Sequence, residues 1–322
     1  MTPVRFIAVA LAIISADASA SAQTYPSRPI TLVVPYTPGT GIDIIARTLA
    51  PRITERWGQP VIVDNKPGAS GNLGADLVAK SAPTGTTLMV TVVTFTVAPA
   101  MTKNMPFDVA KDFTPIAEVA TGSMALVVNP KVLPVASLKE LIDEARKHPG
   151  TLNYGSPGSG TPQHLGPELL KQGLGIDIVH VPYRGAAGQV TDLIAGQVHF
   201  AYLPVHTAMP FTQTGQLRVL AVASDRRSLL APDAPSFKEL GYANLEMELW
   251  FGIYGPAKLP PDVVQKWAEL LPPILELPEV KDTWLKQGLV PFYAPSEEFG
   301  RLTLSELARW KAVVEKAGIQ PE

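Results

Sequence analysis

Short apolar runs alternate with longer segments of helical periodicity along this chain, and that alternation constrains the fold more than any other feature. The first apolar runs are Ile30–Pro35, Val61–Val63 and Leu88–Val93. Between the first two runs, apolar residues recur at every fourth position over residues 45–57, which places them on one helical face. A second helix is predicted over Leu73–Lys80. Strands that alternate with helices in this order typically form a parallel sheet with helices on both faces.

The alternation restarts in the middle of the chain and ends in a helical tail. The predicted strands of this part are Met124–Val128, Leu152–Tyr154, Ile178–Val181, Val198–Tyr202, Leu217–Ala223 and Trp250–Tyr254. The predicted helices are Ser137–Lys147, His164–Gln172, Ala186–Ala195, Asp262–Leu271, Glu279–Gln287 and Glu297–Ala317. Ser137 and Glu140 have the spacing of a capping box, Gly58 predicts the end of the first helix, and Pro51 predicts a kink within it. We therefore predict an α/β fold of two lobes, each built on a mixed, mostly parallel sheet flanked by helices.

Composition excludes several classes of protein. Of the 322 residues, 46% are hydrophobic, which is enough apolar material for a packed core and excludes general disorder. The formal net charge of −2 argues against a nucleic-acid-binding protein, because such proteins usually carry a basic excess. The chain has no Cys, which excludes disulfides, thiol catalysis and cysteine-ligated zinc.

The first 22 residues have the order of parts that a secretory signal requires. Arg5 supplies a positive charge, residues 6–14 form an apolar run, and Ala20 and Ala22 fit the small-residue cleavage pattern. The apolar run is shorter than the roughly 20 residues that a membrane-spanning helix needs. We therefore expect cleavage after Ala22 and export of the remaining chain to the periplasm. The alternative is a buried N-terminal helix.

Three loops rich in Gly, Ser and Thr each follow a predicted strand and precede a predicted helix. They span residues 36–41, 67–71 and 155–161. In an open α/β sheet such loops gather at the carboxyl ends of the strands, where ligands bind. Their glycines let backbone N–H groups approach a ligand closely, and the helix that follows adds a partial positive charge. One such loop alone is more often an ordinary turn, but the first and third loops together predict an anion site that needs no basic side chain.

Motifs of enzymes and metal sites are incomplete in this chain. The stretch that starts at Gly39 lacks the last glycine of a dinucleotide-binding loop, and neither a GxxxxGK[ST] motif nor a GxSxG nucleophile elbow occurs. His164 and Glu168 stand four residues apart on a predicted helix, which is a weak metal signal. We therefore expect no cofactor and no metal. The alternative function is an exported hydrolase or lyase acting on a carboxylate, with Ser156 or Ser159 as nucleophile and His164 as base, but no third member of a triad is recognisable.

A series of short motifs resembles the substrate-binding proteins of tripartite tricarboxylate transporters, a TctC-like group also called the Bug family. The motifs are YPSRPI (25–30), PYTPGTGIDIIAR (35–47), GQPV (58–61), DNKPGASG (64–71), GA (74–75), DFTP (112–115), LNYGSPGSGTPQHL (152–165), HVPYRG (180–185), DL (192–193), GQV (196–198) and WFG (250–252). Their number and order make the resemblance specific, and it covers almost all of the chain after residue 22.

This resemblance implies a two-lobed periplasmic binding protein of the Venus flytrap type, similar to type II binding proteins. Lobe one would comprise residues 23–124 and 250–322, and lobe two residues 125–249, with boundaries accurate to about ten residues. Such a protein closes over a small organic carboxylate and delivers it to the membrane permease subunits of its transporter. We also expect a monomer that is not an enzyme and has no nucleic-acid partner.

The resemblance also implies the residues of the binding site, because the family holds one carboxylate through amides, hydroxyls and waters of the first and third loops. In lobe one the matching residues are Tyr36, Thr37, Pro38, Gly39, Thr40, Gly41 and Asp43. Of these, Asp43 is expected to orient the loop or cap the helix rather than to touch the anion. In lobe two the expected residues are Ser156, Gly158, Ser159, Gly160, Thr161, His164, Tyr183, Arg184, Gly185, Leu203 and His206.

Departures from the family pattern bear on the choice of ligand. Thr40 stands where the family commonly has Gly, and no acid stands near Leu203, which disfavours a ligand with a free ammonium. The region of residues 92–95 is more apolar than usual. We therefore expect a ligand with one proximal carboxylate and an apolar or aromatic distal part, namely an aromatic carboxylate or a short dicarboxylate. Arg184 or His206 would meet a second acid group, unless Arg184 forms a salt bridge on the lobe surface.

Overall fold

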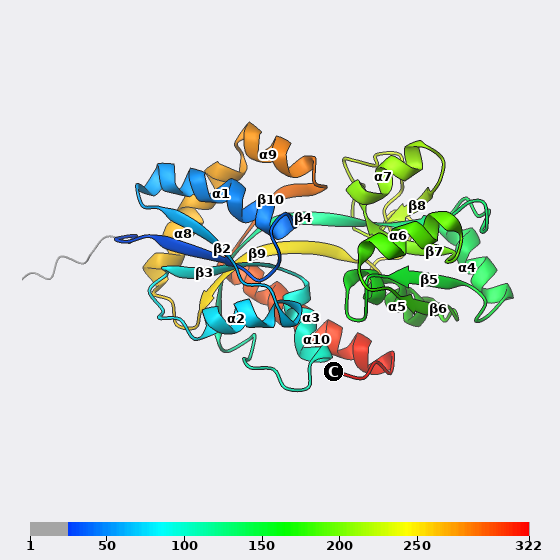
Figure 1. Ribbon diagram of the computed structural model, residues 1–322, viewed down its shortest axis with the longest axis horizontal. Helices are drawn as coiled ribbons and strands as arrows, with labels where there is room; N and C mark the ends of the chain where they lie inside the picture. The colour runs from blue at the N-terminus through cyan, green and yellow to red at the C-terminus, as the bar shows by residue number, and fades with distance from the viewer. Residues whose placement is uncertain (1–24, 322) are drawn as a thin grey trace, which may run out of the picture.

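The computed structural model describes residues 25–321 and shows two α/β lobes lying side by side (Figure 1). Two long strands, β4 (Phe113–Val128) and β9 (Glu248–Pro256), run along the middle of the molecule between the lobes. The predicted signal and its cleavage site, residues 1–22, lie outside the described residues. Among residues 25–321, no helix combines the length and apolar character that crossing a membrane requires.

Lobe one is built on a mixed sheet in the order β2-β1-β3-β9-β4, with β10 also paired to β4. Its other strands are β1 (Ile30–Val34), β2 (Val61–Asn65), β3 (Thr87–Val92) and β10 (Leu289–Pro295). β1 pairs in parallel with β2 and β3. The pairs β3–β9, β9–β4 and β4–β10 are antiparallel.

Lobe two is built on the second half of β4 and four shorter strands. These are β5 (Asn153–Ser156), β6 (Val179–Pro182), β7 (Phe200–Pro204) and β8 (Arg218–Val222). β5 pairs in parallel with β6 and β7. Residues 124–128 of β4 pair antiparallel with β7 and β8. Because β4 contributes its first half to one sheet and its second half to the other, it connects the two lobes directly.

Helices cover both faces of each sheet. In lobe one they are α1 (Gly41–Trp57), the short 3₁₀ helix η1 (Ala69–Gly71), α2 (Asn72–Ala79), α3 (Thr94–Met101), α8 (Pro261–Leu275), α9 (Pro278–Leu285) and α10 (Ser296–Lys316). In lobe two they are α4 (Leu138–Lys147), α5 (Pro162–Leu174), α6 (Ala186–Ala195) and α7 (Val205–Gln213). In Figure 1, α1 and α9 lie above the sheet of lobe one, whereas α2, α3 and α10 lie below it.

The predicted two-lobed α/β fold is confirmed, but parallel pairing is confined to the outer strands of each lobe. The chain passes between the lobes along β4 and β9, and these strands run antiparallel to their neighbours. The sequence patterns also missed the first half of β4 and the whole of α3, α7 and β10. α3 and α7 contain Pro99 and Pro210, so packing rather than intrinsic propensity stabilises them.

The ends of two helices form as predicted. Ser137 Oγ accepts the Glu140 N–H at 3.2 Å, while the Glu140 carboxylate accepts the Ala136 N–H at 2.8 Å. Gly58 ends α1 in the left-handed conformation, with φ +68°. Pro51 does not break the first helix, and α1 runs uninterrupted from Gly41 to Trp57. Pro51 lies on the exposed side of α1, where water can hydrogen-bond the carbonyl that the proline leaves unpaired.

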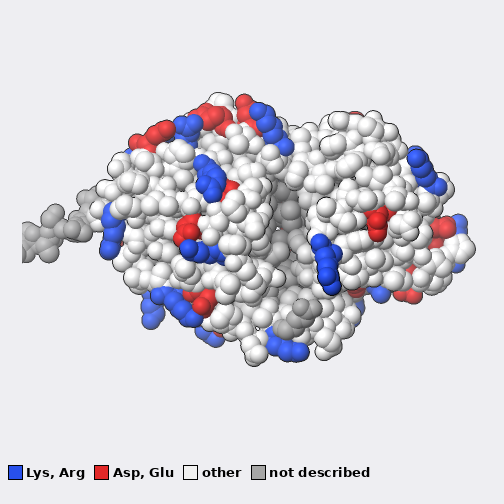
Figure 2. Space-filling model, viewed as in Figure 1, with Lys and Arg blue, Asp and Glu red and all other residues white. Residues whose placement is uncertain are grey.

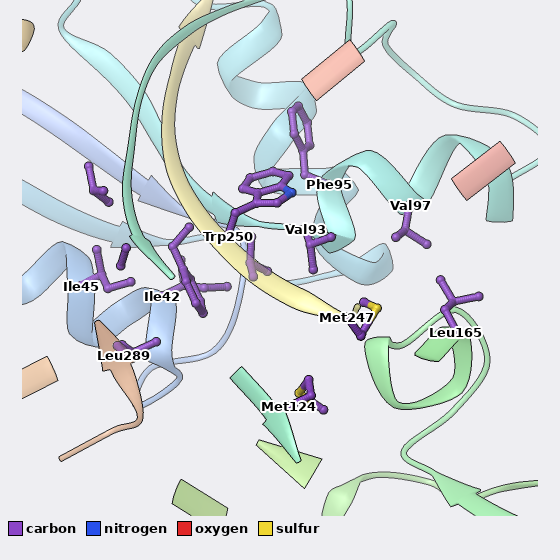
Figure 3. Close-up of a cluster of buried hydrophobic side chains, with 14 of the residues drawn as sticks. Ile42, Ile45, Val93, Phe95, Val97, Met124, Leu165, Met247, Trp250 and Leu289 are labelled. Atoms are coloured by element: carbon purple, nitrogen blue, oxygen red, sulfur yellow. The ribbon is translucent and has the colours of Figure 1, made fainter. Parts of the chain in front are cut away.

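A single apolar cluster extends through both lobes beneath the cleft. Figure 3 shows Val93 and Trp250 of lobe one in the same cluster as Met124 and Leu165. A second, smaller cluster packs on the other face of the lobe-two sheet. Because successive residues of a strand point to opposite faces, Tyr202 belongs to the first cluster and Leu203 to the second.

Candidate ligand-binding cleft

A cavity of about 430 Å³ lies between the two lobes, beside the loops that follow β1 and β5. Its lining residues are Tyr36, Ala69, Ser70, Asn72, Thr94, Val97, Ala98, Met101, Thr102, Ser159, Gly160 and Thr161. None of these residues carries a charge. Figure 2 shows the surface hollowed between the lobes, and the walls of this hollow are mostly uncharged on the face in view. A ligand in this cavity would therefore meet hydroxyls, backbone groups and apolar side chains.

The first loop, residues 36–41, is held by two hydrogen bonds, one to the first turn of α1 and one within the loop. The Gly39 N–H donates to Asp43 Oδ2 at 2.9 Å, and Thr40 Oγ1 donates to the Thr37 carbonyl at 3.0 Å. Gly39 has φ +84°, a conformation that strongly favours glycine. Of this loop only Tyr36 lines the cavity, while residues 37–39 are exposed and α1 begins beside Leu289 of β10.

The third loop, residues 155–161, is built on the same frame in the other lobe. The Gly160 N–H donates to His164 Nδ1 at 3.1 Å, and Thr161 Oγ1 donates to the Gly158 carbonyl at 2.7 Å. Gly160 has φ +73°. In both loops a glycine N–H donates to the side chain four residues later. The threonine that follows this glycine donates its hydroxyl to the carbonyl three residues before the threonine. Ser159, Gly160 and Thr161 of this loop all line the cavity.

Both loops lead into a helix whose N-terminus has no side-chain cap. Thr40 before α1 has φ −74° and ψ 160°, and Thr161 before α5 has φ −73° and ψ 156°. Neither threonine caps the helix that it precedes, since each hydroxyl is used within its own loop. Uncapped N-terminal N–H groups and the helix dipole favour a negative charge at these positions.

Asp43 is the buried support of the first loop. Its carboxylate accepts hydrogen bonds from the Gly39 N–H, from Arg47 Nε at 3.0 Å and from Asn65 Nδ2 at 2.9 Å. Burial by itself would raise the pKa of Asp43, but these hydrogen bonds and the Arg47 charge hold it below its usual range. Asp43 therefore orients the loop, which is the role expected for it, and its charge is already satisfied by the protein.

His164 and Ser156 lie beneath the third loop rather than on its surface. His164 is 4% exposed and Ser156 is fully buried. Ser156 Oγ is 2.6 Å from His180 Nε2 and also within hydrogen-bond distance of the Gly158 carbonyl and N–H. Glu168 does not pair with His164, because Glu168 accepts the Tyr154 hydroxyl at 2.8 Å. Among residues 25–321 no three His, Cys, Asp or Glu side chains come together as a metal site.

The second loop and α3 supply site residues that sequence reasoning missed. The Tyr36 hydroxyl bonds to Thr94 Oγ1 and donates to the Ser70 carbonyl at 3.2 Å. A Cβ at Gly71 would lie 3.1 Å from the Tyr36 hydroxyl, so this close approach requires glycine. The sequence did contain a signal for the second loop, because its composition matches that of the other two loops. No sequence signal pointed to α3, which contributes Val97, Ala98, Met101 and its first residue Thr94 to the cavity.

Several predicted site residues lie outside the cavity. Leu203 is 1% exposed and packs in the second apolar cluster, on the face of the sheet away from Tyr202. The apolar residues of the region 92–95 also lie outside the cavity, because Val92, Val93 and Phe95 belong to the core, and only Thr94 of this region lines the cavity. Phe95 packs at 4.9 Å from both Phe113 and Tyr254. The apolar wall of the cavity comes instead from the next turns of α3.

Four further predicted residues lie on the periphery of the cleft. Tyr183 and Gly185 hold the third loop from below, through N–H bonds to the Ser156 and Pro157 carbonyls. Burial and a hydrogen bond with Asp192 raise the pKa of the Tyr183 hydroxyl to about 12. Arg184 is exposed and, within residues 25–321, makes no ion pair. His206, at the start of α7, lies against Gly288 of lobe one and is half-buried.

Two α/β lobes joined by long strands, with a loop-lined cavity between them, are the architecture of periplasmic solute-binding proteins. The model of the tripartite tricarboxylate transporter family receptor, TctC, matches residues 45–319, and the chain belongs to this family. It is 36% identical over 97% of its length to a UPF0065 protein of Bordetella pertussis, with 96% of that protein covered. It is 32% identical to BugT of the same organism, with 97% of this chain and 96% of BugT covered.

Solved structures of similar proteins share the fold. An R. palustris protein with adipate has a TM-score of 0.76 and 33% identity, covering 92% of this chain and 100% of that one. MatC of Rhodopseudomonas palustris with bound malate has a TM-score of 0.72 and 27% identity, covering 90% of this chain and 100% of that one. Adipate and malate are both dicarboxylates, so two relatives of this chain bind small organic acids.

Proposed function

We propose that this protein captures a small organic carboxylate between its lobes and delivers it to the membrane permease of a tripartite tricarboxylate-type transporter. The matching frames of the first and third loops carry this proposal. Each loop presents an uncapped helix N-terminus and a glycine-shaped turn, one from each lobe. When the lobes close, the two loops would grip one carboxylate from opposite sides through N–H groups and hydroxyls. A ligand shifts the open and closed populations only if it binds the closed form more tightly, and a two-sided grip provides that difference.

The uncharged lining favours an anion whose charge is met by backbone groups. Hydrogen bonds to a charged group contribute on the order of 1.5–3 kcal/mol each, so a few of them support micromolar or tighter binding. Val97, Ala98 and Met101 form an apolar wall next to the polar loops. This combination fits a dicarboxylate with an aliphatic middle or an aromatic carboxylate, and the adipate and malate relatives support the dicarboxylate.

Closure requires a hinge, and we propose that it lies where β4 and β9 pass between the lobes. Residues 23–124 and 250–322 would then move as lobe one and residues 125–249 as lobe two. This proposed boundary at residue 124 lies where the pairing partners of β4 change from β9 and β10 to β7 and β8. We further propose export to the periplasm after cleavage at Ala22, and a monomeric state.

An enzymatic function has less support from the geometry. Ser156 is fully buried and its hydroxyl is used inside the third loop, so a substrate carbonyl cannot reach it. Ser159 is exposed but has no histidine partner among the described residues, and His164 Nδ1 is occupied by the Gly160 N–H. These contacts fit a loop built for binding, and we infer that the protein is not an enzyme.

Thermal unfolding with added ligands tests the proposal. The ligands are adipate, malate and benzoate, and the matched control is adipamide, which keeps the shape of adipate without its charge. A ligand at 100 times its dissociation constant stabilises the folded state by about 2.7 kcal/mol. We expect this stabilisation with at least one acid and none with adipamide. Equal shifts with adipamide, or no shift with a broad set of organic acids, would contradict the proposal, and proton NMR of the recovered ligand would reveal turnover.

A further inference from the structure

We propose that His164, stacked on His180, is a positioning residue that holds the third loop in its anion-binding shape and does not itself touch the ligand. The inference rests on the proposed function of that loop and assigns two imidazoles, the buried His164 and the half-buried His180, a specific task within it. The expectation from family resemblance placed His164 among the ligand contacts, whereas the contacts described above place it underneath them.

The backbone of the third loop depends on the two imidazoles at two separate points. His164 Nδ1 accepts the Gly160 N–H at 3.1 Å. His180 Nε2 lies 2.6 Å from Ser156 Oγ, which in turn accepts the Gly158 N–H at 3.2 Å and donates to the Gly158 carbonyl at 3.1 Å. Gly158 and Gly160 are the two glycines of the loop with positive φ, so the supports act at the turns that have the most freedom to rearrange.

The two imidazoles support each other by stacking. Their ring centroids are 3.9 Å apart with an interplanar angle of 11°, and Tyr154 continues the stack at 5.0 Å from His180. The Tyr154 hydroxyl is anchored by Glu168, so the far end of the stack is fixed as well. His180 therefore lies between His164 and Tyr154, and the stack fixes the orientation of the His164 ring from one face.

The hydrogen bonds also assign the tautomers of both rings. Because Gly160 donates to Nδ1, the proton of His164 must reside on Nε2. The Ser156 network is complete when His180 carries its proton on Nε2 and donates it to Ser156 Oγ, since Ser156 then donates to the Gly158 carbonyl. A doubly protonated His164 would place an N–H against the Gly160 N–H and a charge against the neighbouring ring. The positioning role therefore requires neutral imidazoles, and burial favours the neutral form of both.

Asp43 provides an internal precedent for this role. It stands four residues after Gly39, as His164 stands four residues after Gly160, and it accepts the glycine N–H in the same way. Asp43 is 3% exposed and His164 is 4% exposed, and neither lines the cavity. The two lobes thus use different chemistry at an equivalent position. In lobe one a carboxylate is satisfied by Arg47 and Asn65, whereas in lobe two a neutral ring is satisfied by stacking.

A pair of substitutions at His164 separates positioning from packing. His164→Asn keeps an acceptor near the place of Nδ1, whereas His164→Leu removes it, and both lose the stack with His180. We expect both variants to lose similar thermal stability. His164→Leu should weaken binding of the carboxylate found by the ligand screen about tenfold more than His164→Asn does. Equal affinities of the two variants, or a greater loss in His164→Asn, would overturn the proposal.

His199→Leu, which removes a lobe-two histidine bonded to Asn153, is the control for loss of a histidine elsewhere in that lobe.

A second measurement needs no ligand and so separates this inference from the proposed function. In the free protein, hydrogen exchange measures the protection of the Gly160 amide, and ¹⁵N NMR identifies the tautomer of His164. We expect the Gly160 amide to be protected in the wild type and in His164→Asn but not in His164→Leu, with His164 as the Nε2–H tautomer. An unprotected Gly160 amide in the wild type would overturn the positioning role even if the protein binds carboxylates. Protection without carboxylate binding would instead contradict the function proposed for the loop.

Discussion

Gly160 and Met101 meet across the two lobes, so that a Cβ on Gly160 would lie 3.1 Å from Cγ and Cε of Met101. Gly160 belongs to the third loop of lobe two, and Met101 is the last residue of α3 in lobe one. Both residues line the cavity between the lobes. The contact marks the point where a lobe-two loop that presents N–H groups touches the apolar wall of lobe one.

The first prediction concerns the space at this contact. Gly160→Ala should weaken ligand binding, because the added methyl group must displace Met101 and strains a residue with φ +73°. Gly175→Ala is the matched control, since Gly175 has φ +61° at the end of α5 and no atom within 4 Å of its Cβ position. Isothermal titration of both variants should show a loss of affinity only for Gly160→Ala, while both lose about 1 kcal/mol of stability. Equal affinities would argue against the cavity being the binding site.

The second prediction tests the first loop in the same way. Gly39→Val should weaken carboxylate binding more than it weakens folding, because a β-branched side chain blocks close approach to the backbone. Gly58→Val is the control, as Gly58 has φ +68° at the other end of α1 and, like Gly39, has no atom within 4 Å of its Cβ position. Denaturant unfolding should give similar losses of stability, and titration should give a loss of affinity for Gly39→Val alone. A loss of affinity shared by both variants would place the effect in α1 as a whole.

The third prediction is a dependence of stability on pH that arises from the stacked imidazoles. Burial lowers the pKa of His164 to about 3, with a contribution from His180, and burial lowers that of His180 to about 4. The unfolded histidines titrate near 6.5, so the unfolded state binds more protons than the folded state between about pH 6.5 and pH 3. Stability should therefore fall as the pH decreases through this window. Urea unfolding should show a shallower fall for the double variant His164→Asn, His180→Gln, and parallel pH profiles would refute the assignment.

The fourth prediction concerns Glu118, a buried acid of β4 that lines a second cavity, between β9, β10 and α10. Burial raises its pKa to about 8, and the charges of Glu248 and Glu298 add to this effect. The folded state therefore holds a proton between about pH 4.3 and pH 8 that the unfolded state has lost, and stability decreases as the pH rises through that window.

Glu118→Gln removes this penalty, so the variant should match the wild type near pH 4 and be more stable at pH 9. The gain is bounded by about 1.4 kcal/mol for each pH unit of the window. Glu315→Gln, on the exposed face of α10, is the control and should change stability little at either pH. Denaturant unfolding at the two pH values checks the expectation, and a variant that is less stable at pH 9 would contradict it.

Local sequence patterns were sufficient wherever a single segment decides its own structure. The four-residue spacing over residues 45–57 predicted α1, and Ser137 with Glu140 predicted the start of α4, because both features involve neighbours along one helix. The three Gly-rich loops were also visible in the sequence, since glycine at a positive φ and a following helix are local properties. Of the residues expected at the site, Tyr36, Ser159, Gly160 and Thr161 do line the cavity.

Residues whose role depends on the partner of a strand or helix could not be assigned in this way. Leu203 and Tyr202 are adjacent on β7, which pairs with β4. Within that sheet Tyr202 points into the first apolar cluster and Leu203 into the second. α3 enters the cavity because β3 directs it there, although its own sequence of β-branched residues and proline favours no helix.

The sequence by itself determined the alternation of strands and helices, the three glycine-rich turns and the family to which the chain belongs. Only the tertiary structure decided which side chains face the cavity and which lie beneath it. The physical reason is that a periodic pattern specifies a buried face but not the element packed against that face. His164 of α5 illustrates this limit, since its place beneath the third loop follows from its contact with His180, which is sixteen residues further along the chain on strand β6.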